Sequence, residues 1–317
     1  MKQEITFGGL TARPGEAARG YAPLGDTGFS MPVTVLNGAG EGKTVILSSG
    51  LHGGEYPSIE AAIELARELD PGELNGQLVI FHPVNLSGFE RRLSYLLPET
   101  GENLNRFFPG RPDGTTAERI AWAITSEYQD RADFFIDIHG GDLHEALPPY
   151  VYYPGLGPEE TVEASRRAAL LLNASYMVKS GATTGAYNSA ALRGVPSLLI
   201  ERGGRGLWTP AEVEDYKADL KNLFRHLGLL EGEALRPGRP ATLITRAEYL
   251  DAGHSGCWYP AVGLEERVKE GQKLGEIRDV FGRPLEEIRA AYDGIVLFMT
   301  VSLAVAKGDP ILTYGAP

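Results

Sequence analysis

Short apolar runs alternate along most of the chain with segments whose apolar residues recur at helical spacing. The runs are typical of buried strands and cover residues 44–48, 78–81, 133–139 and 197–201. Helical periodicity marks residues 59–69, 117–128, 159–172 and 211–230. Strands that alternate with helices indicate an α/β fold. We expect a mostly parallel or mixed sheet with helices on both faces.

The pattern changes after the Gly- and Pro-rich segment 231–241. Beyond it, short strands and turns prevail, with one brief helical segment expected at 285–290. Residues 252–274 and 291–312 form a weak repeat of a glycine turn, an apolar strand, a V-x-x-G turn and a closing strand. We therefore predict a first domain over residues 1–235, and over 236–317 a C-terminal β-sandwich that resembles the barrel-sandwich fold. Neither repeat has the lysine hairpin of a cofactor carrier, which favours a structural role.

Composition excludes several classes of protein. The 317 residues include 30 Lys and Arg against 42 Asp and Glu, a net charge of −12. This balance argues against binding to nucleic acid or to an anionic membrane. A single cysteine excludes a disulfide framework and cysteine-rich metal sites, so nitrogen and oxygen must hold any metal. Without a secretion signal or membrane-length apolar run, we expect a cytoplasmic protein, monomeric or homo-oligomeric.

Two polar motifs follow predicted strands. His52 and Glu55 lie on a Gly-rich loop after the first strand, and His139 ends the third. Open α/β sheets bind ligands at the carboxyl ends of their strands, and two histidines with one glutamate match a catalytic zinc site. Asp137 lies on the same side of its strand as His139, where it can orient a liganding histidine. The alternative for each motif is a structural hydrogen bond or a glutamate at a helix start.

Two further segments offer candidate chemistry. Glu201 ends the last predicted strand, and a carboxylate beside a metal can act as a general base. The alternative is an ion pair of Glu201 with Arg202 or Arg205. Asn105 and Arg106 provide donors that suit a carboxylate, unless the arginine only forms surface salt bridges.

Taken together, these motifs resemble the succinylglutamate desuccinylase/aspartoacylase family. They are His52-x-x-Glu55, Asn105-Arg106, Asp137-x-His139 and Glu201-x-Gly-Gly. Members of this family are zinc-dependent amidohydrolases with a carboxypeptidase-like fold and a C-terminal β-rich domain. The longer HPVN…NLNRFFPG text is similar to the broad deacylase branch, which includes N-acetyl-diaminobutyrate deacetylases.

The resemblance implies a role for each matching residue. His52, Glu55 and His139 would bind one zinc ion per chain, and Glu201 would be the catalytic base and acid. A substrate carboxylate would be held by Asn105 and Arg106. A further arginine, Arg92 or the adjacent Arg91, would contact the substrate or polarise its carbonyl.

We therefore expect a zinc-dependent deacylase that cleaves the amide bond of a small N-acylated amino acid or related carboxylate-bearing compound. The resemblance also implies possible substrates with ester bonds, because members of this family are described as hydrolysing esters as well. Two alternatives stay open. One is a metallocarboxypeptidase that acts on the C-terminus of a peptide, and the other is a non-catalytic module that binds a metal or a carboxylate.

Overall fold

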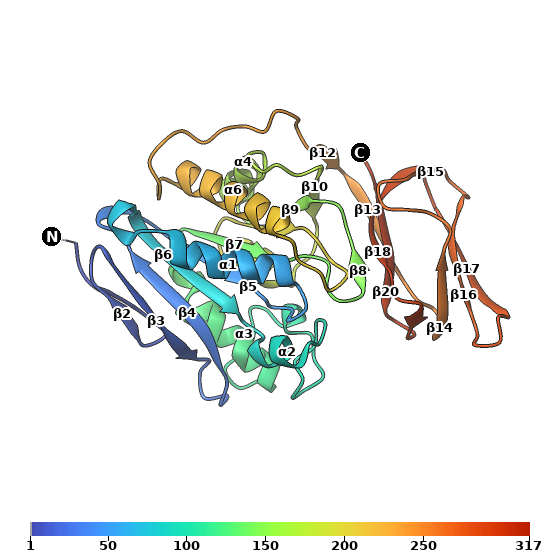
Figure 1. Ribbon diagram of the computed structural model, residues 1–317, viewed down its shortest axis with the longest axis horizontal. Helices are drawn as coiled ribbons and strands as arrows, with labels where there is room; N and C mark the ends of the chain where they lie inside the picture. Colours follow the sequence, from blue (N-terminus) through green and yellow to red (C-terminus); the bar gives the residue numbers. More distant parts are fainter. Residues whose placement is uncertain (1) are drawn as a thin grey trace.

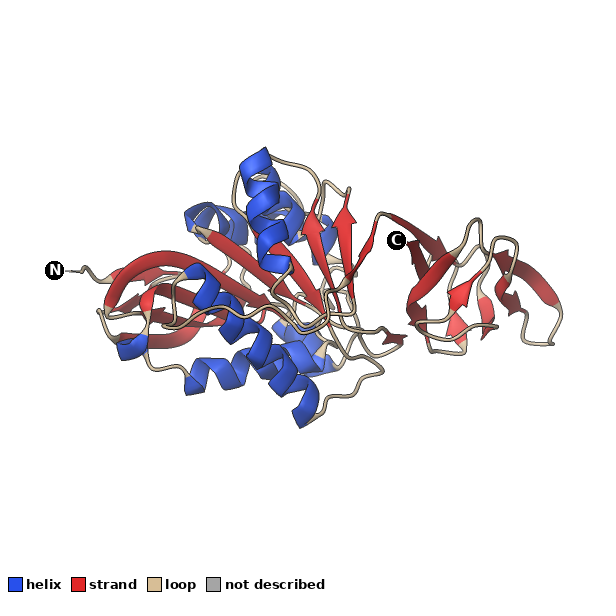
Figure 2. Cartoon of the chain, turned by 90° about the horizontal axis from the view of Figure 1, so that it is seen from above, coloured by secondary structure: helices blue, strands red, loops and turns tan. Residues whose placement is uncertain are grey.

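A nine-stranded mixed sheet forms the centre of the computed structural model, which describes residues 2–317 (Figures 1 and 2). Its strand order is β12-β10-β9-β11-β7-β5-β6-β4-β3. The strands are β3 (Glu16–Pro23), β4 (Ser30–Asn37), β5 (Gly40–Ser49), β6 (Asn75–Pro83), β7 (Phe134–Ile138), β9 (Tyr150–Pro154), β10 (Tyr176–Ser180), β11 (Ser197–Glu201) and β12 (Thr242–Ile244). β6, β5, β7 and β11 run parallel to one another, whereas β9 is antiparallel to β11 and β4 to β6.

Helices cover both faces of this sheet, as Figure 2 shows. One face packs against α1 (Tyr56–Glu68), α4 (Glu159–Ala169) and α6 (Pro210–Leu227), and the other against α3 (Thr116–Glu127) and α5 (Ala186–Leu192). Successive strand residues point to opposite faces, so Val45 and Leu47 join the first core while Ile46 joins the second. This two-sided burial explains the continuous apolar runs. Within residues 2–317, no helix is both long and apolar enough to cross a bilayer.

The remaining short elements lie outside these layers. β1 (Ile5–Phe7) and β2 (Leu10–Ala12) form a separate antiparallel ribbon. The short helices are α2 (Leu86–Arg91) and the 3-10 turns η1 (Pro71–Glu73), η2 (Leu104–Arg106) and η3 (Gln129–Arg131).

The C-terminal region is an antiparallel β domain of two sheets with an apolar core that contains Trp258, Leu274 and Ile311. One sheet contains β13 (Arg246–Asp251), β20 (Pro310–Ala316), β18 (Gly294–Thr300) and β15 (Arg267–Val268). The other contains β17 (Pro284–Arg289), β16 (Lys273–Arg278), β14 (Gly256–Pro260) and β19 (Ala304–Val305). The two halves of the repeat supply β15 and β19, and each of these strands precedes a glycine with positive φ, Gly271 or Gly308.

The helix expected at 285–290 is wrong. Residues Pro284–Arg289 form β17, which pairs antiparallel with β16 from one end to the other, with two register shifts. Ile288 enters the core of the β domain from this strand. The backbone partners that β16 offers, together with burial of Ile288, outweigh the local helical preference of the Leu-Glu-Glu-Ile text.

The β domain contacts the central sheet through both hydrogen bonds and apolar packing. The two-residue strand β8 (Glu145–Ala146) belongs to the first part of the chain, but it pairs with β18 of the β domain. A small core also joins the two regions and includes Tyr150, Tyr176, Ile295 and Leu297. Just past the Gly- and Pro-rich segment, β12 adds to the edge of the central sheet beside β10.

Helix α6 forms hydrogen bonds and an ion pair with the chain at the carboxyl ends of β7 and β11. The Tyr216 hydroxyl donates to the carbonyl oxygen of His139, and the Ile200 carbonyl lies 3.4 Å away. The Arg202 guanidinium is buried and pairs with Asp219 of α6, and it also donates to the Asn173 carbonyl at 2.8 Å. Both contacts fix the backbone next to candidate site residues.

Substitution of Asp219 by alanine should destabilise the fold strongly. It would leave the buried Arg202 guanidinium without its counter-charge, which typically costs about 3–5 kcal/mol. Chemical denaturation would measure this loss. Asp26→Ala is the control, because Asp26 is exposed and its partner Arg119 is half-exposed, so stability should change little. Equal effects of the two variants would contradict the anchoring role of Asp219.

Candidate active site

The loop between β5 and α1 carries the first two candidate ligands. It leaves β5 at Gly50, whose φ of +63° turns the chain, and Pro57 in the first turn of α1 starts the helix. Gly53 lies against the backbone of α2, and a Cβ at this position would come within 2.3 Å of the Phe89 nitrogen. The close approach fixes the path of the loop and therefore the positions of His52 and Glu55.

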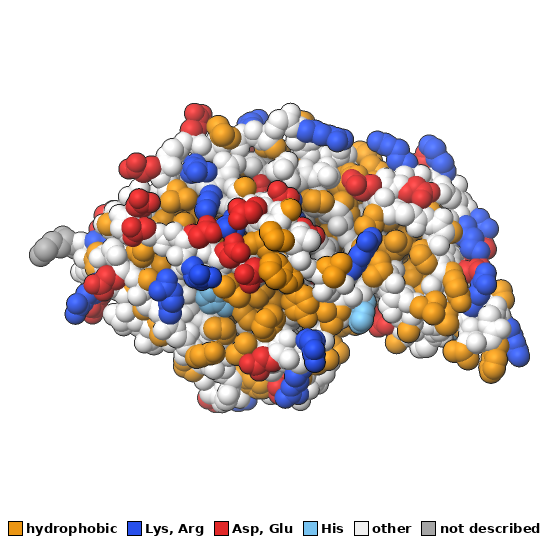
Figure 3. All heavy atoms as spheres, viewed as in Figure 1, with side chains coloured by type: hydrophobic (Ala, Val, Ile, Leu, Met, Phe, Trp, Pro, Cys, Tyr) orange, Lys and Arg blue, Asp and Glu red, His pale blue; other side chains and the backbone are white. Residues whose placement is uncertain are grey.

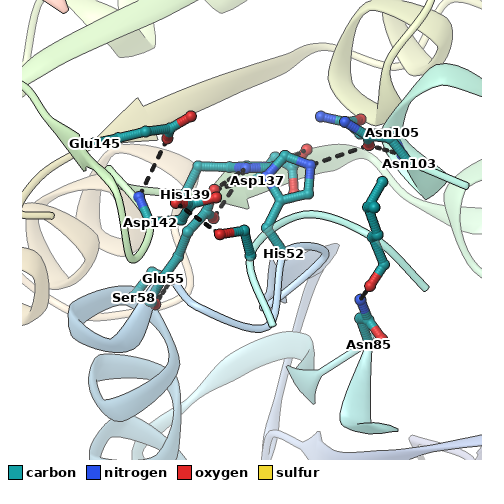
Figure 4. Close-up of polar contacts among 12 residues, drawn as sticks. His52, Glu55, Ser58, Asn85, Asn103, Asn105, Asp137, His139, Asp142 and Glu145 are labelled. Carbon is teal, nitrogen blue, oxygen red and sulfur yellow. Dashed lines mark hydrogen bonds and ion pairs between the residues drawn. The ribbon is translucent and has the colours of Figure 1, made fainter. Parts of the chain in front are cut away.

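The structure brings His52, Glu55 and His139 together, although His139 follows a different strand (Figure 4). The Nδ1 atom of His52 lies 2.7 Å from Glu55 Oε1, and the Nδ1 atom of His139 lies 3.1 Å from Glu55 Oε2. One ligand atom from each side chain falls within 4.8 Å of the others. Glu55 and His139 are each only 2% exposed. The three side chains therefore form a compact, buried set of nitrogen and oxygen donors.

Both histidines direct Nδ1 towards Glu55 and Nε2 away from it. His52 Nε2 donates to Asn103 Oδ1 at 3.2 Å, and His139 Nε2 lies 3.2 Å from Asp137 Oδ2. An acceptor beside Nε2 keeps the ring proton on that atom, which leaves the lone pair of Nδ1 free to bind a cation. Neighbouring acceptors fix the histidine tautomer in this way in many metal sites. The role of Asn103 was not foreseen from the sequence, although its spacing of two from Asn105 places it in the same turn.

The polar atoms of this cluster fit a divalent metal ion. Within residues 2–317, Glu55 Oε2, both carboxylate oxygens of Asp137 and His139 Nε2 are buried, and their contacts at 3.1 and 3.2 Å are ion pairs without hydrogen-bond alignment. Burial alone would lower the pKa of His139, but the charges of Glu55 and Asp137 raise it well above its usual value. Such a surplus of buried negative charge is compensated when a cation binds. Two histidines and one carboxylate are also a suitable ligand set for such an ion.

Glu201 and Arg202 are adjacent in sequence but point to opposite sides of the sheet. The carboxylate of Glu201 lines the cavity beside the metal-ligand cluster, and its Oε2 is buried without a hydrogen bond in the described chain. The Arg202 side chain instead reaches Asp219 behind the sheet. The alternative of a Glu201–Arg202 ion pair is therefore wrong. Burial raises the pKa of Glu201 to about 8, with further increases from the charges of nearby carboxylates.

A cavity of about 670 Å³ opens above these residues. Its walls come from the carboxyl ends of the central strands and from the β domain, which contributes Tyr249, Asp251 and Phe298 among others. Several tyrosines line this cavity. The hydroxyl groups of Tyr152 and Tyr249 form a hydrogen bond of 3.1 Å between the central sheet and the β domain. The volume is that of a small-molecule site rather than an extended groove.

Asn105 and Arg106 also line this cavity. Asn105 is buried, and its Oδ1 accepts a hydrogen bond from the backbone of Ala186 at 2.9 Å, which ties η2 to the start of α5. The Arg106 side chain is exposed. The guanidinium is consequently free to meet a ligand that enters the cavity.

Arg91 and Arg92 are not brought into the main cavity. Both are exposed at the end of α2, and Arg91 lies 3.5 Å from Glu99 at the surface. Arg92 adopts a left-handed backbone with φ of 54° and lines a smaller adjacent cavity of about 310 Å³. Tyr95 lines both cavities. A contact of Arg92 or Arg91 with substrate therefore stays a prediction.

Substitution of Gly53 by alanine should disturb the loop that carries His52 and Glu55. The new Cβ would meet backbone atoms that cannot move independently, and crowding of this kind costs about 1–3 kcal/mol. Thermal unfolding would measure the loss. Gly263→Ala is the matched control, since its Cβ would have no neighbour closer than 4.0 Å. Equal stability of the two variants would contradict the close packing of the loop on α2.

The chain is similar to known proteins along most of its length. A family model of the succinylglutamate desuccinylase/aspartoacylase catalytic domain matches residues 41–227. An N-alpha-acetyl-L-2,4-diaminobutyric acid deacetylase from Halomonas elongata is 30% identical over 291 residues, which cover 89% of this chain and 84% of that protein.

Two solved structures are similar over 95% of both chains. They are a succinylglutamate desuccinylase/aspartoacylase from Rhodobacter sphaeroides (TM-score 0.80, 29% identity) and the product-bound ectoine utilization protein EutE (DoeB) from Ruegeria pomeroyi (TM-score 0.83, 27% identity). The chain therefore belongs to the succinylglutamate desuccinylase/aspartoacylase family of hydrolases.

Proposed function

We propose that this protein is a zinc-dependent deacylase that hydrolyses the amide bond of a small N-acylated amino acid. The observation that carries the proposal is the convergence of His52, Glu55 and His139 beside the carboxylate of Glu201 in one cavity. The similarity to a deacetylase of an N-acetylated amino acid supports acetyl as an acyl group to test first. The size of the cavity supports a small substrate.

The proposed metal is one zinc ion per chain, held by His52, Glu55 and His139. Zinc in such a site would polarise the scissile carbonyl and acidify a water molecule. Asp137 and Asn103 orient the two histidine rings from behind, at 3.2 Å in each case.

Glu201 is the proposed general base and acid. Its carboxylate takes a proton from the attacking water and delivers it to the nitrogen of the leaving amine, so that one residue serves both halves of the reaction. The raised pKa of Glu201 suits this exchange, because a group that gains and loses a proton works best near neutral pH.

Arg106 and Asn105 are the proposed anchors of the substrate carboxylate. Arg106 is exposed on the cavity wall, where it can form a charge-assisted hydrogen bond with an incoming anion. Arg92, with Arg91 as its neighbour, would stabilise the developing oxyanion only if its side chain reached from the adjacent cavity past Tyr95.

The proposed division of the chain places this chemistry in a carboxypeptidase-like catalytic domain over residues 1–235. The C-terminal β domain, residues 236–317, then contributes cavity wall rather than reacting groups. The contact of Tyr152 with Tyr249 and the pairing of β8 with β18 support such a role.

A hydrolysis screen tests the proposed reaction. The zinc-loaded protein is incubated with N-acetyl and N-succinyl amino acids, simple esters and short peptides, and amine release is measured. Turnover of the acyl amino acids is expected. Release of C-terminal residues from peptides alone would instead indicate a carboxypeptidase, and bound zinc without hydrolysis of any amide or ester would indicate a binding module.

The variant Glu201→Gln should lose nearly all turnover but keep its metal. The amide cannot accept or deliver the proton, and such assistance is worth about 10²–10⁴ in rate. The rate on an N-acetyl amino acid and the metal content are measured together. Glu163→Gln, at a half-exposed position of α4, is the matched control and should act as the parent protein does. Near-normal turnover of Glu201→Gln would refute the proposed base.

The variant His139→Ala should lose metal, because only two of the three protein ligands remain and two ligands rarely retain zinc. Elemental analysis after dialysis gives the metal content per chain. His226→Ala is the control, since His226 lies exposed on α6. A full metal complement in His139→Ala would contradict the ligand assignment.

A further inference from the structure

The turn between β16 and β17, which we call the hairpin tip (residues 279–283), presents apolar side chains to solvent. Val280 and Phe281 follow each other in this turn and are each 80% exposed. The Arg283 guanidinium lies beside them, with its Cζ atom 5.7 Å from the centre of the Phe281 ring. Aromatic residues and arginine are enriched at protein–protein interfaces. The hairpin tip therefore has the composition of a contact surface.

Hydrogen bonds hold the hairpin tip in one shape. Asp279 Oδ1 accepts from the backbone nitrogens of Phe281 and Arg283, each at 2.9 Å. The Asp279 nitrogen also donates to the Arg283 carbonyl at 2.9 Å, and Gly282 turns the chain with a φ of +82°. A turn that is already ordered loses little conformational entropy when it binds. The tip thus presents its apolar side chains in a fixed arrangement.

A groove on the central region, which we call the α1 groove, has the size and the walls to receive an aromatic side chain. Its volume is about 280 Å³, less than half that of the main cavity. Its apolar lining consists of Tyr56, Ile59 and Ile63 of α1, Phe89 of α2, and Trp208. The rings of Tyr56 and Phe89 meet edge to face with their centroids 6.1 Å apart, and Trp208 is 51% exposed. Aromatic side chains in such a wall pair favourably with a further ring.

The charges of the hairpin tip and of the α1 groove are complementary. The tip carries one carboxylate and one guanidinium, Asp279 and Arg283, on the two sides of Phe281 in the sequence. The groove also carries one of each, Glu60 and Arg92. Figure 3 shows apolar side chains gathered near the start of α1, beside acidic side chains over α1 and α6. An arginine that approaches this groove is therefore attracted, and opposite charges that meet also fix the orientation of two partners.

The hairpin tip cannot occupy the α1 groove of its own chain. The turn lies at the end of the β domain that is remote from the helices of the central region (Figures 1 and 2). The β domain is also held in place, because β8 pairs with β18 and β12 pairs with β10. A second copy of the chain can supply the tip. If each tip enters the groove of the other copy, two identical contacts form about a two-fold axis and the assembly closes.

We propose that the α1 groove binds the hairpin tip of a second copy, so that the chain forms a two-fold dimer. Phe281 is the anchor that fills the groove against Trp208, and Arg283 pairs with Glu60. Asp279 of the tip then faces Arg92. Two short turns bury little surface, and small interfaces are typical of reversible association, so the dimer dissociates on dilution. This inference does not depend on the proposed deacylase function.

Sedimentation velocity over a concentration series tests the dimer. The parent chain should change from monomer to dimer as its concentration rises. Phe281→Ser, Arg283→Glu and Glu60→Arg should each weaken association by about 10-fold or more, because each change acts at both contacts. Combining Arg283→Glu with Glu60→Arg restores opposite charges and should recover most of the association. Leu235→Ser is the control, since Leu235 is 69% exposed but lies outside both surfaces.

Cross-linking tests where the tip binds. Val280→Cys and Leu207→Cys place thiols beside the two anchors, at positions that are 80% and 61% exposed, and Cys257→Ser removes the native thiol. A short bis-maleimide should give a covalent dimer when both new thiols are present and little when either is alone. A parent chain that stays monomeric at every concentration would overturn the proposal. A dimer that survives the charge variants, or that does not cross-link between positions 207 and 280, would overturn the assignment to these surfaces.

Discussion

Parallel hydrogen bonding between β5, β7 and β11 is the constraint on which the candidate site depends. Because parallel strands end at the same edge of a sheet, this pairing places residues 52, 139 and 201 side by side. The strands carry apolar residues on both faces and are clamped by helices, so their ends cannot shift without loss of two cores. Helix α6 adds a further restraint, since Tyr216 and Asp219 hold the backbone beside His139 and Glu201.

The C-terminal β domain completes the cavity that this sheet begins. Its strand β18 faces two cores at once, because Val296 packs within the β domain and Leu297 packs against the central sheet. The same strand pairs with β8, which continues the loop of Asp142 and Glu145. This short segment of backbone therefore lies both on the cavity wall and at the junction of the two regions. The candidate metal ligands and Glu201, by contrast, all lie at strand ends of the central sheet or in the loop after β5.

Features encoded within short segments could be predicted from the sequence. Strand ends, helix starts and the motifs around His52, His139 and Glu201 depend on neighbours along the chain, and the structure brings these residues together. Features that depend on distant partners were missed. β17 forms because β16 offers it backbone hydrogen-bond partners, and Tyr249 reaches the site only because the β domain packs against the central sheet. Asp142 and Glu145 likewise reach the cavity wall only through the folded path of their loop.

The position of β12 limits how this chain can be divided. β12 lies beyond the predicted boundary at residue 235, yet it covers the edge of β10 in the central sheet. A fragment cut at that boundary would expose the backbone of β10 as an unpaired edge, which other chains can extend. It would also leave β8 without β18. Each region thus contributes one strand to a sheet of the other. Exchange of β domains between relatives would therefore succeed only if the sequences were joined after Ile244.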